Sequence, residues 1–167
     1  EEAVLYEKDP KTKIATITMK MADRLNAVTT GMRLRYVDYI HRANIDDDVK
    51  VLVIRGAGDD LGSGADLPEF MAVQDSDDDG PRLAEYRIAA GEITFPPKGS
   101  LRRGATVSQW YANPHSGIRS LQDFKKISIL EVKGYCYGWH FYQAADADLV
   151  ISSDDAVFGH PSFRYHG

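Results

Sequence analysis

The sequence predicts an α/β layered fold, because one pattern of strand, helix and strand occurs twice. The strand-like segment Ile14 to Met19 is followed by a helical pattern from Val28 and by the almost continuously apolar run Val49 to Ile54. The pattern returns in the last third of the chain, at Ile127 to Val132, from about Trp139, and at Ala147 to Ser152. Strands that alternate with helices are typical of folds in which helices pack on a sheet.

The first predicted element is a hairpin. Ile14 to Met19 alternates branched apolar residues with threonine, which is the two-residue period of a strand with one buried face. Val4 to Tyr6 can supply the partner strand, since Asp9 to Thr12 has the composition of a turn.

An amphipathic helix is predicted next, because apolar residues recur near a 3.6-residue period. Asn26, Thr29 and Thr30 are its candidate N-caps, and three aspartates at 46–48 end it. The run Val49 to Ile54 has the composition of a strand covered on both faces. The apolar positions of the helix are Met32, Tyr36, Tyr39, Ile40 and Ala43.

Residues 71–120 differ from the rest and predict an insertion or mobile loop that faces the substrate. The acidic run Asp75 to Asp79 precedes Gly80 and Pro81, which favours a solvated loop. A calcium site is the alternative, although the spacing is not that of an EF-hand. Ile118 to Phe124 is predicted to be a short helix before the next strand.

Composition narrows the function classes. A chain of 167 residues with a net charge of −5 predicts one domain, and it has no basic run to bind nucleic acid or a membrane surface. The sequence has no apolar run of the roughly 20 residues that a membrane span needs, and its first residues lack the pattern of a signal peptide. The only cysteine, Cys136, excludes an internal disulfide and fits a cytoplasmic location, where such a thiol is usually a small buried hydrophobe.

Two glycine-rich turns carry the candidate chemistry, since each follows a buried strand and opens a predicted helix. They are Gly62 to Leu67, with the helix beginning near Leu67, and Gly134 to His140. The first backbone N–H groups of a helix have no acceptor inside it, so they suit an anion or a polarised carbonyl oxygen. Two such turns can converge on one oxygen and stabilise an enolate or oxyanion.

Four ordered blocks of residues resemble the crotonase (enoyl-CoA hydratase/isomerase) superfamily. Met21 to Ala27 resembles its N-R-P-x-x-x-N-A segment, and Val51 to Leu67 is similar to the block of its first oxyanion donor. Lys133 to Gly138, together with Ala147 to Pro161, is similar to the second. The resemblance covers almost the whole chain.

The resemblance implies a crotonase-like spiral of repeated β-β-α units that binds a bent acyl-CoA. Residues 1–167 are then one domain that is incomplete at the C-terminus, because family members continue past Gly167 with a helical part. The family also implies a homotrimer or hexamer, CoA as part of the substrate, no permanent cofactor and no metal. By position, the two oxyanion donors fall on the backbone N–H groups of Ala65 and Trp139. The CoA contacts fall on Arg24, Leu25, Ala27, Asp66 and Leu67.

The chain departs from the family where hydratases place two glutamates, which act as general acid and base. The positions hold Tyr142 and Ser162, whose hydroxyls are poor bases near neutral pH. His140 can act as acid or base, or it can be structural, and His160 is expected to be structural. The indole of Trp139 belongs either to the core or to a pocket for an aromatic acyl group.

Two functions remain open. The leading one is an acyl-CoA enzyme of fatty-acid or aromatic-acid metabolism, acting as isomerase, hydrolase or C–C lyase rather than by simple hydration. The alternative is a non-catalytic binding or scaffold protein, which the loss of both carboxylates favours. The two retained glycine turns favour the enzyme.

Overall fold

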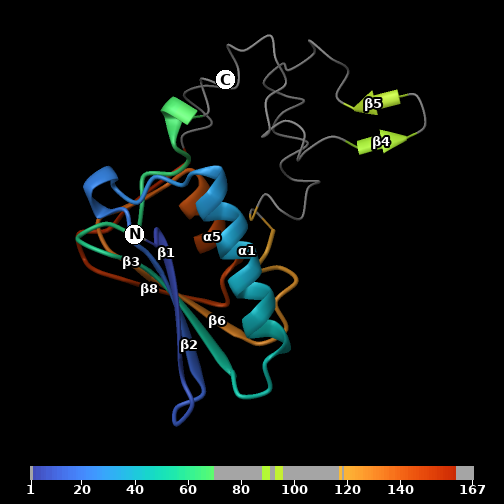
Figure 1. Ribbon diagram of the computed structural model, residues 1–167. Helices are drawn as coiled ribbons and strands as arrows, with labels where there is room; N and C mark the ends of the chain where they lie inside the picture. Colours follow the sequence, from blue (N-terminus) through green and yellow to red (C-terminus); the bar gives the residue numbers. More distant parts are fainter. Residues whose placement is uncertain (1, 70–87, 91–92, 96–116, 118, 161–167) are drawn as a thin grey trace.

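The computed structural model describes residues 2–69, 88–90, 93–95, 117 and 119–160, and its framework is a five-stranded sheet (Figure 1). β1 is antiparallel to β2, and the other neighbouring strands are parallel. In sheet order the strands are β1 (Val4–Asp9), β2 (Ile14–Met19), β3 (Val51–Gly56), β6 (Ile127–Val132) and β8 (Leu149–Ser152). The hairpin and the later strands are therefore confirmed.

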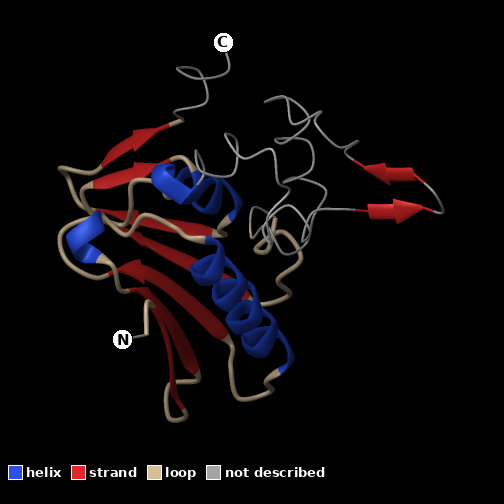
Figure 2. Cartoon of the chain, turned by 45° about the horizontal axis from the view of Figure 1, so that its top comes forward, coloured by secondary structure: helices blue, strands red, loops and turns tan. Residues whose placement is uncertain are grey.

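Two helices, α1 (Thr30–Ile45) and α5 (Trp139–Asp146), lie side by side on one face of this sheet (Figures 1 and 2). They meet through Tyr36, whose hydroxyl donates a buried hydrogen bond of 2.7 Å to the side-chain oxygen of Gln143. The apolar residues predicted for α1 are all buried, as the amphipathic pattern requires. None of the described helices is long and apolar enough to cross a membrane.

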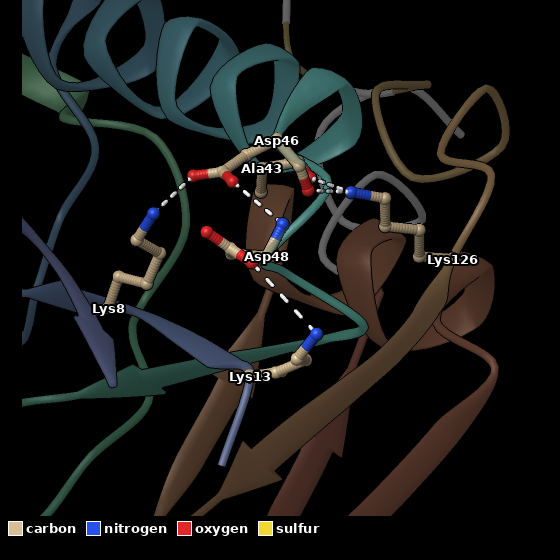
Figure 3. A network of polar contacts seen from close by, with 6 residues as sticks. All are labelled: Lys8, Lys13, Ala43, Asp46, Asp48 and Lys126. Carbon is tan, nitrogen blue, oxygen red and sulfur yellow. Dashed lines mark hydrogen bonds and ion pairs between the residues drawn. The ribbon is translucent and has the colours of Figure 1, made fainter. Parts of the chain in front are cut away.

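Thr29 is the N-cap of α1, and its hydroxyl accepts the N–H of Met32 at 3.3 Å. At the other end of α1, Lys126 lies between the helix and β6 and donates to the backbone carbonyls of Ala43 (2.7 Å) and Asp46 (Figure 3). The Asp46 carboxylate also pairs with Lys8 at 2.8 Å. A cation at the last carbonyls of a helix satisfies them and complements the helix dipole, so this cluster holds α1 on the sheet.

Smaller elements complete the described part. β7 (Tyr135–Tyr137) leaves the main sheet and pairs in parallel with β9 (Val157–Gly159). The order β-β-α therefore occurs twice, as β1–β2–α1 and as β6–β7–α5. The sequence treated residues 134–138 as a turn alone and missed β7. The remaining elements are the 3-10 helix η1 (Ala22–Arg24) and the antiparallel pair β4 (Ile88–Ala90) and β5 (Ile93–Phe95).

Two expectations differ from the structure. The short helix predicted over Ile118 to Phe124 is wrong for its described residues, which form turns with i to i+3 bonds such as Phe124 N–H to the Leu121 carbonyl (3.2 Å). The apolar pattern there arises because Leu121 and Phe124 enter the core. In β3, Leu52 and Ile54 are buried while Val51 and Val53 are partly exposed, since the described helices cover one face only.

Most of the predicted loop within 71–120 lies outside the described residues, and so does its acidic run with the calcium alternative. No group of three or more potential metal-ligating side chains lies within the described part of the chain.

Candidate active site

The two glycine turns lie against each other. Gly62 and Cys136 form a parallel bridge, in which the Gly62 N–H donates to the Tyr135 carbonyl (2.8 Å) and the Gly62 carbonyl accepts the Tyr137 N–H (3.0 Å). Two residues later, a Cβ added to Gly64 would lie 3.1 Å from the Tyr137 carbonyl oxygen and 3.5 Å from the Trp139 nitrogen. The first turn therefore touches the second at the residue predicted to be its oxyanion donor.

The direction of the Ala65 amide follows from the peptide that precedes it. The Gly64 carbonyl accepts the Val28 N–H at 2.8 Å. In a trans peptide the N–H points opposite to the carbonyl, so the Ala65 N–H points away from Val28. Gly64 has a φ of +103°, so its own N–H points in another direction than the N–H of Ala65. Among the described residues, the Ala65 N–H has no acceptor.

The helix predicted to begin near Leu67 is present, and Asp66 is its N-cap. The Asp66 carboxylate is buried and accepts the Glu69 N–H at 3.0 Å. Glu69 in turn accepts the Thr30 N–H at 2.9 Å, so the first turn is tied to the N-terminal end of α1.

Trp139 is the first residue of α5, and its N–H belongs to the end of the helix that carries partial positive charge. Its indole is 5% exposed and packs edge-on against Tyr36, with ring centroids 4.8 Å apart. A Cβ on Gly117 would approach the indole to 3.1 Å. These contacts favour the core alternative for the side chain over stacking on a flat acyl group.

His140 is fully buried, and its Nδ1 accepts the Gly64 N–H at 3.1 Å. Burial lowers its pKa from 6.5 to about 3. An imidazole that stays neutral and already accepts a backbone bond is a weak proton carrier at neutral pH, so the structural alternative is favoured over the acid or base.

The positions that replace the two glutamates are only partly described. Tyr142 lies one turn into α5, partly exposed, and its ring meets His160 edge-on at 5.1 Å between centroids. His160 also packs on Phe141 at 5.6 Å, which fits the packing role expected for it. Ser162 lies outside the described residues.

The five positions assigned to CoA lie together beside the first turn. Ser63 N–H donates to the Leu25 carbonyl at 2.9 Å, which joins the segment at 24–27 to residues 63–67. Arg24 forms an ion pair with the buried Asp66 carboxylate. Leu25 and Leu67 expose 42% and 53% of their surface, and Ala27 is partly buried. The guanidinium of Arg24 is therefore already paired with a carboxylate.

Asn26 is a structural residue whose role the sequence did not reveal, since the sequence indicates it only as a candidate helix cap and as part of the segment that resembles the family motif. Its side chain is buried, accepts the Met21 N–H (2.8 Å) and donates to the carbonyls of Ala57 and Asp60 (2.9 Å each). Asp60 accepts the Tyr135 N–H at 2.8 Å. One chain of bonds thus connects the segment before α1, the loop after β3 and the second turn.

Cys136 lies buried in β7, and burial raises its pKa to about 12. It therefore behaves as the small hydrophobe expected. Asp148 accepts both the N–H and the hydroxyl of Ser128, each at 2.8 Å, so its carboxylate has a hydrogen-bonding role next to β6.

Comparison with known proteins identifies the fold. No protein-family model matches the chain. A hydroxycinnamoyl-CoA hydratase-lyase of Pseudomonas fluorescens is 27% identical over 87% of this chain and 44% of its own length. A mevalonyl-coenzyme A hydratase of Aspergillus fumigatus is 24% identical over 93% of this chain and 47% of its own.

Among solved structures, an enoyl-CoA hydratase/isomerase from Xanthobacter autotrophicus Py2 superimposes with a TM-score of 0.73 at 23% identity, over 98% of this chain and 51% of its own. This chain therefore spans about half the length of the relatives it matches. The chain therefore has the crotonase fold, and the curated relatives it resembles are proteins of the enoyl-CoA hydratase/isomerase family.

Proposed function

We propose that this chain forms the thioester-polarising part of an acyl-CoA enzyme. The backbone N–H groups of Ala65 and Trp139 bind the thioester oxygen and stabilise the enolate or oxyanion that forms on it. The observation that carries the proposal is the Gly64 peptide. Its carbonyl accepts the Val28 N–H, which turns the Ala65 N–H away from Val28, and a Cβ added to Gly64 would lie 3.5 Å from the Trp139 nitrogen. Preorganised amides that face a developing negative charge lower the barrier to its formation, and in many enzymes they do so more than any other group.

The bound CoA is proposed to lie along residues 24–27 and 66–67. Exposed Leu25 and Leu67 offer apolar contacts at the rim, and the backbone there is fixed by the bonds to Ser63 and Val28. No permanent cofactor is needed for such chemistry, because the thioester itself carries the reacting carbonyl.

The reaction is proposed to be isomerisation, hydrolysis or C–C cleavage rather than simple hydration. Tyr142 stands where hydratases of the family place a glutamate, and a hydroxyl cannot hold and activate water as a carboxylate does. Tyr142 is proposed to face the substrate at this position, and Ser162 is proposed to be catalytic by its place in the sequence alone. We also propose that the protein assembles as a homotrimer or hexamer and works in the cytoplasm.

The test is turnover of a panel of aliphatic and aromatic enoyl-CoA and β-keto-CoA thioesters, followed by mass spectrometry in isotopically labelled water. The proposal predicts turnover of at least one thioester, with label entering next to the carbonyl or in a new carboxylate. Binding without turnover of any member would support the scaffold alternative instead.

A further inference from the structure

We propose that His140 is a positioning residue, which sets the Ala65 and Trp139 amides in register by joining the two turns with its own side chain. The inference rests on the proposed function, because it assigns a role in arranging that site. His140 follows Trp139 directly on α5, whereas its ring lies on the first turn. One residue therefore links the proposed donors.

The hydrogen bond holds the peptide between Ser63 and Gly64, next to the peptide that carries the Ala65 N–H. His140 Nδ1 accepts the Gly64 N–H at 3.1 Å, while the Gly64 carbonyl accepts from Val28 at 2.8 Å. With both ends of Gly64 held, the orientation of the next N–H is determined. Gly64 has φ +103, a conformation that side chains rarely adopt and that the two bonds maintain.

Packing prevents the ring from moving. A Cβ on Gly62 would lie 2.2 to 2.6 Å from three ring atoms, so the imidazole rests directly on the Gly62 backbone. The Trp139 indole meets it edge-on, at 5.2 Å between centroids and 87° between planes. His140 is 1% exposed. A side chain that is held on both sides transmits the position of α5 to the first turn.

The charge state suits this role. Nδ1 can accept an N–H only when it carries no proton, so the ring is neutral with its proton on Nε2. Burial keeps it neutral across the physiological range. The link therefore persists throughout the physiological pH range, where a general acid or base would change its charge.

The hydrogen bond is tested directly in the unaltered protein. After ¹⁵N labelling, NMR should detect a coupling across the hydrogen bond between Gly64 N and His140 Nδ1. The Nδ1 chemical shift should stay that of an unprotonated nitrogen from pH 8 to pH 5. Absence of the coupling, or protonation of Nδ1 in this range, overturns the inference without requiring any variant to fold.

The positioning role is tested with [1-¹³C]butanoyl-CoA, a saturated thioester with no double bond to hydrate. In the unaltered protein the bound carbonyl signal should move downfield, because two amides polarise it. His140→Ala should bind the probe within about threefold of the same Kd but lose the shift. It should also lower kcat for the best thioester of the panel by about tenfold to a hundredfold, with KM little changed.

His140→Asn supplies an oxygen where Nδ1 accepts, and it should restore much of the shift and of kcat. His41→Ala, an exposed histidine of α1, is the matched control and should change neither. A carbonyl shift that survives in His140→Ala overturns the positioning role while the proposed function stands. If both His140 variants lose one limb of the pH–rate profile, His140 acts as an acid or base, and the positioning role is overturned. If the carbonyl signal does not shift in the unaltered protein, both the proposed function and this inference are overturned.

Discussion

At the scale of single residues, the site depends on a few side chains that hold backbone rather than touch a ligand. Asn26 makes three partly buried hydrogen bonds and the His140 ring accepts a buried one from Gly64, so that these side chains hold both glycine turns. The sequence indicated where the turns lie, because glycine residues mark them. It could not reveal Asn26 as the connecting residue, since its partners lie 31 and 34 positions away along the chain.

Asn26→Ala should lower the free energy of unfolding by about 2–3 kcal/mol, because three partly buried backbone groups lose their partner. Denaturant unfolding followed by circular dichroism measures it. Asn44→Ala is the control, since Asn44 accepts a single exposed bond from the Lys125 N–H, and its effect should stay below about 1 kcal/mol. Equal effects in the two variants would show that Asn26 is not a structural centre.

Gly64→Ala should destabilise the protein by about 1–3 kcal/mol and lower kcat by about a hundredfold or more. Its methyl group would be forced into a strained conformation between the Tyr137 carbonyl and the Trp139 nitrogen. Gly31→Ala is matched to it, because a Cβ there meets nothing closer than Thr29 Oγ1 at 4.0 Å. Gly31 is the second residue of α1, where that change should raise stability by less than about 1 kcal/mol. Full activity in Gly64→Ala would contradict the proposed site.

At the scale of elements, regular periodicity made most of the fold predictable. The hairpin, α1 and the strand β6 follow from two- and 3.6-residue patterns that reflect burial on one face. β7 could not be predicted, because a three-residue strand beside Gly134 and Gly138 carries too little pattern. The turns at 119–123 were mistaken for a helix because Leu121 and Phe124, three residues apart, are both buried.

Lys126→Ala should lower the free energy of unfolding by about 1–2 kcal/mol, because the last carbonyls of α1 lose a charged donor. Lys125→Ala removes a neighbouring exposed lysine whose backbone, not side chain, makes the described bond to Asn44. That control should lie within about 0.5 kcal/mol of the unaltered protein. Thermal and denaturant unfolding compare the two, and a null effect at Lys126 would mean that the cluster in Figure 3 does not anchor α1.

At the scale of the whole molecule, four ordered blocks that resemble the crotonase superfamily were enough to predict the fold, which the solved structures confirm. The chemistry was less predictable. From the sequence alone, a histidine beside a presumed donor can be an exposed base or a buried hydrogen-bond acceptor. The packing of α5 against the first turn distinguishes these two roles.

Global stability should fall as the pH drops below 6.5. The unfolded chain then protonates His140, whereas the folded protein resists until about pH 3, so protons favour unfolding across that window. Between pH 6.5 and 4.5 the loss should be about 2–3 kcal/mol, and it should be absent in His140→Asn. Carboxylates with lowered pKa, such as Asp148, add their loss only as the pH approaches 3.8. A flat profile from pH 6.5 to 4.5 would show that His140 is not buried as a neutral ring.

The most direct test of the paired amides is an NMR titration of the ¹⁵N-labelled protein with two matched ligands. Butanoyl-CoA carries the thioester carbonyl, and S-butyl-CoA is the thioether that lacks it. The account predicts that the amide protons of both Ala65 and Trp139 move downfield with butanoyl-CoA and not with S-butyl-CoA. Equal shifts with the two ligands, or a carbonyl-dependent shift at only one of the two amides, would contradict it.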